Sequence, residues 1–333
     1  MHLEQLKRRE FIALLGGAAA AWPLAVRAQQ QRMRRVGVIL PAGADDAEFQ
    51  TLYGTFLQAL GQLGWTIGHN VQIDVRWATG NNVNIRKHAS ELAALAPDVI
   101  VAHGASTVSP MQQASRTIPI VFTVASDPVA TGYADSLARP GGNITGFMTA
   151  EFSTSAKFLE LLKQVAPGVT RAAILRDTDV PAGLGQFSAI QTAAVSLGVE
   201  VSPLNVREIS EIERGIALFA RSPNGGVIVT GSGAARAAAS QIVSVMMRHK
   251  LPAVYFTRTF VNVGGLASFG VDFIDQYRRT AGYVDRILRG EKPGDLPIQM
   301  PVKYQTVINM RTARALGLTV PPTLLARVDE VIE

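Results

Sequence analysis

Residues 98–107 read DVIVAHGAST, and residues 226–235 read GVIVTGSGAA. In both stretches a run rich in Val and Ile, typical of a buried strand, leads into glycine and small polar residues that suit the start of a helix. After each helix a second strand-like run follows, IPIVFT at 118–123 and LPAVYFT at 251–257. Val-Ile-Val runs are common, so chance is one explanation. The shared spacing of Pro, Val, aromatic residue and Thr favours a true repeat.

The same alternation extends outward along the chain. A strand is predicted at 35–40, and apolar residues spaced three and four apart predict a helix over 49–63. In the second half, strands at 172–176 and 200–206 alternate with helices in the same way. This pattern builds parallel sheets covered by helices. We therefore expect an α/β protein with two similar doubly wound parallel-sheet lobes, a hinge and an interlobe cleft.

Each lobe is expected to contain two separate segments of the chain. Residues 29–146 with about 269–295 would form the first lobe, and residues 147–268 with about 296–333 the second. Gly-rich turns predict hinges near 143–149 and 263–269.

A ligand is expected between the lobes, because loops at the carboxyl ends of parallel strands line a crevice. The candidate binding residues are His103, Gly104, Ser106, Thr107, Ser126, Asp127, Asp177, Gly231, Ser232, Tyr255, Phe256 and Ser268.

These candidates have different expected roles. Ser106 and Thr107 would start a helix whose free N–H groups suit a carboxylate, although both residues also serve as plain helix caps. Asp127 would pair with an ammonium group or shape the turn before Pro128. Either Tyr255 or Phe256 would pack on an apolar ligand, since alternation along a strand lets only one face the cleft. His103 would contact the ligand or be a satisfied loop histidine.

Catalytic and metal-binding motifs are incomplete. The stretch 104–108, GASTV, has Val108 where a nucleophile elbow needs glycine, and GSGAAR at 231–236 has Arg236 at the third glycine of a dinucleotide fingerprint. The five histidines have no metal-binding spacing, and no acid, base and nucleophile come together. We therefore expect a binding protein rather than an enzyme, with no metal and no cofactor.

The N-terminus predicts export. Lys7, Arg8 and Arg9 precede a short apolar run that Gly16, Gly17 and Pro23 interrupt, and Val26-Arg27-Ala28 follows. The run is too short to span a bilayer and has the layout of a signal peptide, so cleavage is expected near Ala28. The Arg pair followed by Glu-Phe-Ile resembles a twin-arginine signal, which implies the twin-arginine export machinery and a periplasmic location.

Charge and cysteine content fit this location. Residues 1–28 carry four basic and two acidic residues, so their removal lowers the formal net charge from +6 to +4. The remaining Lys and Arg are scattered without aromatic interleaving, so no nucleic-acid partner is expected. The chain has no cysteine, which excludes disulfides, and its length allows a core without them.

Four segments carry a resemblance to a known family: 63–78, 118–146, 251–273 and the tail from 277. On these segments, among them LGWTIGHNVQIDVRWA and ASDPVATGYADSLARPGGNITG, the chain resembles the tryptophan/tyrosine-type substrate-binding proteins of ABC transporters. The resemblance implies the type I periplasmic-binding fold, a monomer, a small ligand between hinged lobes, delivery to an inner-membrane permease and no catalysis. His103-Gly104-Ala105-Ser106 departs from the family's usual loop, in which a small residue precedes Gly-Thr-Pro.

Three other classes of protein have a two-lobed fold of this kind. A periplasmic ligand-sensing module with the same fold would serve a receptor rather than a permease. A two-lobed enzyme would need a catalytic constellation. A sugar-repressor-like regulator would need a DNA-binding domain at the N-terminus, where the sequence predicts an export signal instead.

Overall fold

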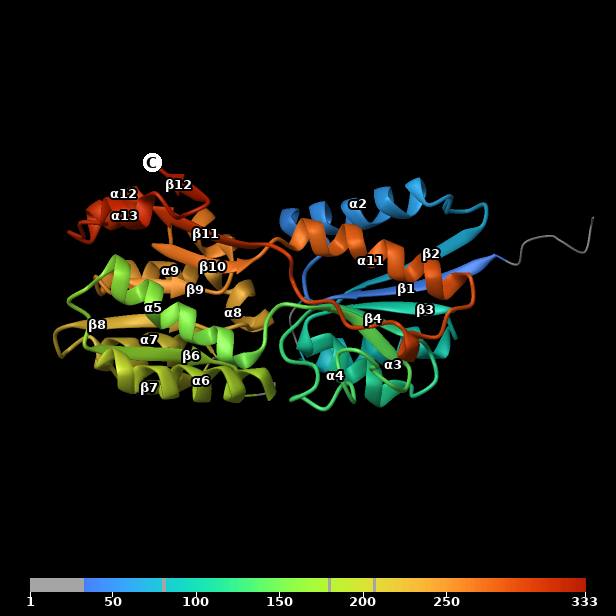
Figure 1. The fold of residues 1–333 in the computed structure, drawn as a ribbon, viewed down its shortest axis with the longest axis horizontal. Coiled ribbons are helices and arrows are strands. Elements are labelled where there is room, and N and C mark those ends of the chain that lie inside the picture. Colours follow the sequence, from blue (N-terminus) through green and yellow to red (C-terminus); the bar gives the residue numbers. More distant parts are fainter. Residues whose placement is uncertain (1–32, 80–81, 179–180, 206–207) are drawn as a thin grey trace, which may run out of the picture.

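The computed structural model describes residues 33–79, 82–178, 181–205 and 208–333. Two α/β lobes lie side by side along the long axis of the molecule (Figure 1), each built on its own sheet. The predicted signal peptide, residues 1–28, lies outside the described residues. Within the described ranges, no helix is both long enough and apolar enough to cross a membrane.

The first lobe contains a five-stranded sheet in the order β2-β1-β3-β4-β5, and all its strands are parallel. The strands are β1 (Arg34–Leu40), β2 (Val71–Trp77), β3 (Val99–His103), β4 (Ile120–Ala125) and β5 (Ile144–Met148). Every residue of β3 is buried. This burial explains why DVIVAH reads as a continuous apolar run instead of an alternating one.

Helices cover both faces of this sheet. On one face, α2 (Ala47–Gln62) packs with α11 (Phe273–Leu288), and on the other α3 (Asn82–Ala94) packs with α4 (Ala105–Ala114). The side chain of Asp46 caps α2 by accepting a hydrogen bond from the Phe49 N–H at 3.1 Å. Phe49, Leu52, Phe56 and Leu60 then form the buried stripe predicted by the spacing, whereas Leu63, also expected on that face, follows the end of the helix and is exposed.

The second lobe contains a seven-stranded sheet in the order β12-β11-β10-β9-β8-β6-β7. Only β10 and β11 pair antiparallel among the described strands. The strands are β6 (Arg171–Arg176), β7 (Glu200–Asn205), β8 (Gly225–Val229), β9 (Ala253–Tyr255), β10 (Ala267–Val271), β11 (Tyr304–Asn309) and β12 (Glu330–Ile332).

The helices of the second lobe form two layers. One core contains α5 (Ala156–Val165), α6 (Pro181–Leu197), α12 (Met310–Ala315) and α13 (Pro322–Leu325). The other contains α7 (Ile209–Phe219), α8 (Gly233–Ala237), α9 (Ala239–Arg248) and α10 (Arg258–Asn262). Two short 3₁₀ helices, η1 (Phe152–Ser155) and η2 (Pro293–Asp295), lie in connecting segments.

The two lobes share one topology, which confirms the predicted repeat. The order β2-β1-β3-β4-β5 in the first sheet matches β7-β6-β8-β9-β10 in the second. DVIVAH supplies β3 and GVIV supplies part of β8, and the neighbouring strands β4 and β9 come from IPIVFT and LPAVYFT.

The chain passes between the lobes at positions shifted from the expected ones. β5 belongs to the first sheet as far as Met148, and β10 belongs to the second as far as Val271. The Gly-rich turns at 140–142 and 263–265 connect elements within one lobe, so they do not form the crossings. The last crossing comes after Gln299, which forms an isolated parallel bridge to Phe147 of β5 before β11 begins.

Candidate functional site

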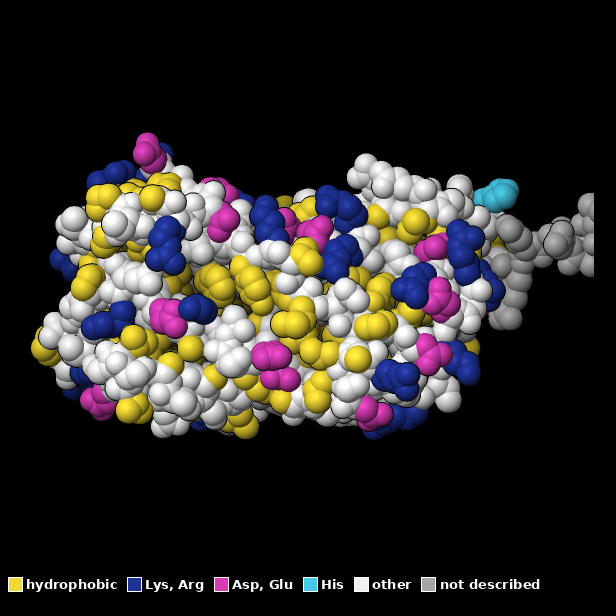
Figure 2. Space-filling view, viewed as in Figure 1, with side chains coloured by type: hydrophobic (Ala, Val, Ile, Leu, Met, Phe, Trp, Pro, Cys, Tyr) yellow, Lys and Arg dark blue, Asp and Glu magenta, His cyan; other side chains and the backbone are white. Residues whose placement is uncertain are grey.

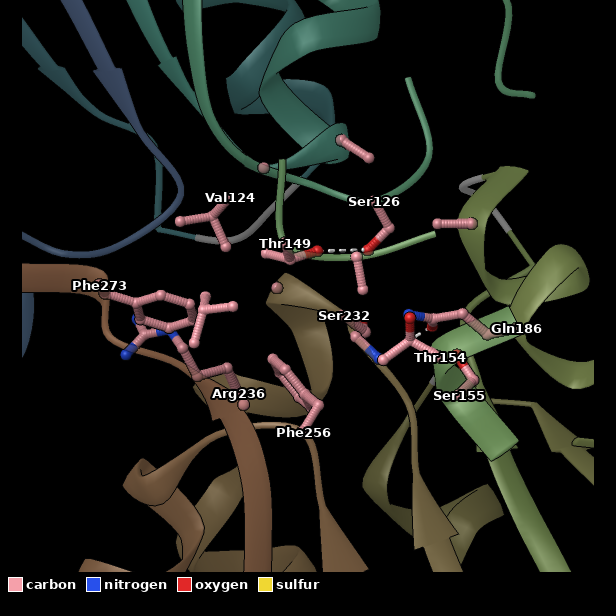
Figure 3. A pocket seen from close by; sticks show the side chains of 18 of the residues that line it. Val124, Ser126, Thr149, Thr154, Ser155, Gln186, Ser232, Arg236, Phe256 and Phe273 are labelled. Carbon is pink, nitrogen blue, oxygen red and sulfur yellow. Dashed lines mark hydrogen bonds between the residues drawn. The ribbon is translucent and has the colours of Figure 1, made fainter. Parts of the chain in front are cut away.

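A cavity of about 110 Å³ lies between the lobes, at the carboxyl ends of the parallel strands. Both lobes contribute to its walls, and the close-up view places Val124, Ser126 and Thr149 opposite Ser232, Arg236 and Phe256 (Figure 3). A cavity needs roughly 10–15 Å³ to hold one ordered water, so this space admits a small molecule. Seven predicted site residues line it: His103, Gly104, Ser106, Ser126, Gly231, Ser232 and Phe256.

The loop after β3 forms the first wall. Gly104 takes a positive φ of 74° before α4 starts at Ala105, a conformation that glycine adopts without strain. Ser106, in the first turn of α4, lines the cavity. Thr107 does not, because its fully buried hydroxyl donates to the His103 carbonyl oxygen at 2.8 Å. The prediction that Thr107 contacts a ligand carboxylate is therefore wrong, because its hydroxyl bonds to the backbone of the same loop.

His103 lies at the end of β3 with 6% of its surface exposed. Its Nδ1 is 2.8 Å from the Tyr277 hydroxyl, and the rings of Phe49 and Phe273 approach it edge-on. Burial, followed by the positive charge of Arg236, lowers the pKa of His103 to about 3. The ring is therefore neutral near pH 7 and presents a hydrogen-bonding surface rather than a charge.

The loop after β4 forms the next part of the wall. The hydroxyls of Ser126 and Thr149 are 2.8 Å apart at the cavity surface (Figure 3). Val124 has a φ of 61°, an outlier for a β-branched residue, where the pairing of β4 with β5 shifts register. The Gln276 side-chain oxygen accepts a hydrogen bond from the Val124 N–H at 3.2 Å and helps hold this conformation.

Asp127 lies beside this loop but does not line the cavity. Its carboxylate accepts hydrogen bonds from the backbone N–H groups of Ala130, at 3.1 Å, and Phe152, at 3.2 Å. The second bond joins the β4 loop to the segment that enters the second lobe. Asp127 therefore shapes the turn before Pro128, and its carboxylate accepts from backbone N–H groups instead of lining the cavity, where the expected ammonium contact would lie.

Residues of the second lobe close the cavity from the other side. The Gly231 N–H donates to Oε1 of Gln186 at 3.1 Å, and the Ser232 hydroxyl donates to Asp177 at 2.8 Å. Asp177 is thus a supporting residue behind Ser232. Ser232 also accepts from the Ala235 N–H and caps α8.

Strand alternation separates the remaining candidates. Tyr255 is buried and stacks on Phe260 with ring centroids 4.6 Å apart, whereas Phe256 lines the cavity. Ser268 is buried within β10, and the next three residues, Phe269, Gly270 and Val271, line the cavity in its place.

Aromatic rings from distant parts of the chain surround the cavity. The lining aromatic residues are Phe158, Phe256, Phe269, Phe273 and Tyr304. Phe269 and Tyr304 stack with centroids 5.2 Å apart. Figure 2 shows hydrophobic side chains across the middle of the molecule, while acidic and basic side chains intermingle over the rest of this face. Apart from Phe256, sequence reasoning missed these rings, because each also reads as an ordinary core residue.

Arg236 is the most informative residue that sequence reasoning missed. It lies on α8 of the second lobe, is 8% exposed, and donates to Asp46 at 2.8 Å and Glu48 at 3.3 Å in the first lobe. Its guanidinium also lies over the Phe49 ring, 4.2 Å from the centroid. Thr259 of the second lobe donates to the same Glu48 carboxylate at 2.6 Å. These contacts hold the lobes closed over the cavity.

Two like-folded lobes closed over an aromatic cavity define a two-lobed ligand-binding protein. Over the described ranges, no group of three or more His, Cys, Asp or Glu side chains is placed to hold a metal. The chain matches the family described as ABC transporter substrate binding protein over residues 36–332, and it belongs to that family.

The chain is also similar to individual proteins in sequence and in fold. The chain is 26% identical over 270 residues to a protein named "Tyrosine-binding protein" from Clostridioides difficile (strain R20291), covering 79% of this chain and 75% of that one. A conserved domain protein from Vibrio cholerae has a TM-score of 0.82 and 25% identity, over 90% of this chain and 100% of that one. A Streptococcus pneumoniae ABC domain in complex with L-Trp has a TM-score of 0.82 and 23% identity, over 90% and 99%.

Proposed function

We propose that this chain is the periplasmic solute-binding component of an ABC import system. It captures a small ligand between its lobes and delivers it to an inner-membrane permease, without catalysis. The observation that carries the proposal is the cavity itself, enclosed by both lobes and lined by five aromatic rings. Family membership and the export signal expected in the sequence support the same role.

The proposed ligand is an aromatic amino acid or another small aromatic carboxylate. Phe256 and Phe273 offer flat apolar surfaces, and Ser106, Ser126 and Gln186 offer polar groups, which is the usual composition of a small-molecule site. The relative named for tyrosine binding and the structure with bound L-Trp support an aromatic ligand.

A thermal-shift screen tests this proposal. The set contains aromatic amino acids, aromatic carboxylates, aliphatic amino acids and sugars. A ligand at one hundred times its dissociation constant adds about 2.7 kcal/mol of stability, so the aromatic compounds should raise the melting temperature clearly. Phe256→Ala should weaken the response, whereas Leu218→Ala, at a position 65% exposed, should not. Shifts given only by sugars or aliphatic compounds would contradict the proposed ligand class.

Delivery to a permease needs a separate test in cells. Deleting the gene for this chain should abolish uptake of the ligand found in the screen. Normal uptake, with loss of a ligand-dependent transcriptional response instead, would favour the sensing module over the transport component.

A further inference from the structure

One wall of the cavity carries hydrogen-bond donors that have no acceptor. Gln186 on α6 is 6% exposed, and Ser155 at the end of η1 is 3% exposed, yet both line the cavity. Among the described residues, the hydrogen bond of the Gln186 side chain is the one that Oε1 accepts from the Gly231 N–H, and Nε2 of Gln186 and Oγ of Ser155 have no protein partner. In Figure 3 the two residues share the side of the cavity opposite Phe273, and the Gln186 amide points toward the centre. Among the described residues, the one fully buried side-chain N or O atom without a hydrogen-bond partner is Asp74 Oδ2, so Gln186 Nε2 and Ser155 Oγ face the open cavity and are free to bond a molecule placed there.

The orientation of the Gln186 amide follows from its one bond. The Gly231 N–H can only donate, so the side-chain atom facing it at 3.1 Å must be the oxygen. The amide NH₂ therefore faces the cavity as a donor. A ligand group placed there must accept hydrogen bonds.

The local sequence brings these donors together. Gly185 precedes Gln186 within α6, where glycine costs a helix about 1 kcal/mol relative to alanine. A Cβ built on Gly185 would lie 2.3 Å from ring carbons of Phe152 in η1. The glycine thus lets η1 press against α6, and this contact sets Ser155 beside Gln186.

The charges around the cavity suit an anionic acceptor. Among the described residues that line it, none is Asp or Glu, and the one charged side chain is Arg236. The Asp46 and Glu48 carboxylates that Arg236 binds are not part of the lining. No lining side chain of the described set therefore repels a carboxylate.

We propose that Gln186 Nε2 and Ser155 Oγ form a subsite for a carboxylate oxygen of the ligand, so that these neutral donors select acids over amines. The inference rests on the proposed function and names the residues that bind the carboxylate end of the ligand. Hydrogen bonds to an ionised acceptor are about twice as strong as those between neutral groups. The Gln186 and Ser155 donors should therefore contribute most of the preference for acids over amines.

The first test uses the full mature chain and three compounds with one ring system: L-tryptophan, indole-3-propionate and tryptamine. In calorimetric titrations, at least one of the two acids should bind at least about tenfold tighter than tryptamine, which lacks the carboxylate. Tryptamine binding within tenfold of both acids would overturn the subsite while leaving a ligand-binding cleft in place. Failure of both acids to bind would overturn the subsite together with the proposed aromatic carboxylate ligand.

Variants then assign the effect to the named atoms. Gln186→Glu keeps an acceptor for the Gly231 N–H but removes the donors and adds negative charge, so the affinity of the bound acid should fall at least about tenfold. Ser155→Ala should weaken the acid about fivefold. Gln191→Glu, exposed on the same helix, is the charge-matched control and should change nothing. Unchanged acid affinity in a folded Gln186→Glu variant would overturn the assignment.

Discussion

Arg236 of the second lobe donates to Asp46 of the first across the cleft, with Nη2 2.8 Å from Oδ2. Asp46 also caps α2, so one carboxylate stabilises a helix start and joins the lobes. Burial raises the pKa of Asp46, but the hydrogen bonds from Arg236 and Phe49 outweigh it, and the net pKa is lowered. The carboxylate is therefore ionised at neutral pH and available to the guanidinium.

Arg236→Met should loosen the closed conformation. Removing one partner of a fully buried ion pair costs about 3–5 kcal/mol. The Asp46 and Glu48 side chains are 27% and 29% exposed, so about 1–3 kcal/mol of closed-state stability is expected here. X-ray scattering should show a larger radius of gyration for the variant than for the parent. Arg248→Met, which removes an exposed pair with Glu213 within the second lobe, is the control, and equal radii for Arg236→Met and parent would contradict the interlobe role.

Stability should fall as the pH drops from 7 to 5 because of His103. Its pKa is about 3 in the folded protein, against 6.5 when unperturbed, so the unfolded chain binds a proton that the folded one does not. Because the pKa of this base is lowered on folding, the free energy of unfolding rises with pH between about 3 and 6.5. At pH 5 the protein should therefore be about 2 kcal/mol less stable than at pH 7.

Urea denaturation of the parent and of His103→Gln at pH 7 and 5 measures this contribution. The variant should lose less stability on acidification than the parent, by about the same 2 kcal/mol. His69→Gln, at an exposed position, is the control. Identical pH dependence in parent and His103→Gln would mean that His103 does not stay neutral when buried.

Gly185→Ala should destabilise the protein by about 1–3 kcal/mol, because the new methyl group overlaps the Phe152 ring. The matched control is Gly282→Ala in α11, where nothing lies within 4 Å of the new Cβ. That change should stabilise the helix by up to about 1 kcal/mol. Thermal unfolding of both variants measures whether each substitution lowers or raises the stability. Equal effects of the two would show that η1 moves away from the new methyl group without loss of stability.

Asp127→Ala should reduce stability by about 1–2 kcal/mol, since two backbone N–H groups lose their acceptor. If the residue only shapes its turn, the affinity for the ligand found in the screen should change less than about threefold. A loss of affinity much larger than the loss of stability would restore the ammonium-binding role suggested by the sequence. Calorimetric titration and denaturant unfolding of one sample give both quantities.

Replacing Arg8 and Arg9 with Lys should leave the precursor in the cytoplasm, because the expected twin-arginine signal depends on that pair. Cell fractionation and the N-terminal sequence of the exported chain check both the route and cleavage near Ala28. Normal periplasmic accumulation of the double variant would argue against twin-arginine export.

The sequence by itself determined the fold. Val-Ile-Val runs, helical spacing and the repeat of residues 98–107 in 226–235 identified two parallel-sheet lobes, since strand and helix patterns depend on neighbours along the chain. The same patterns placed His103, Ser126 and Ser232 at the cavity, because residues that end parallel strands meet at one edge of the sheet.

Only the tertiary structure decided which side chains complete the site. Arg236 became an interlobe partner because Asp46, 190 positions earlier, lies across the cleft, and no local pattern encodes that distance. The Thr107 hydroxyl and the Asp127 carboxylate form hydrogen bonds with nearby backbone groups, which satisfy small polar side chains without a ligand. Gln186 and Ser155 face the cavity because η1 packs against Gly185, a steric contact between segments some thirty residues apart. Periodicity along the chain fixes which elements form, whereas the direction and pairing of each polar side chain depend on what folding brings next to it.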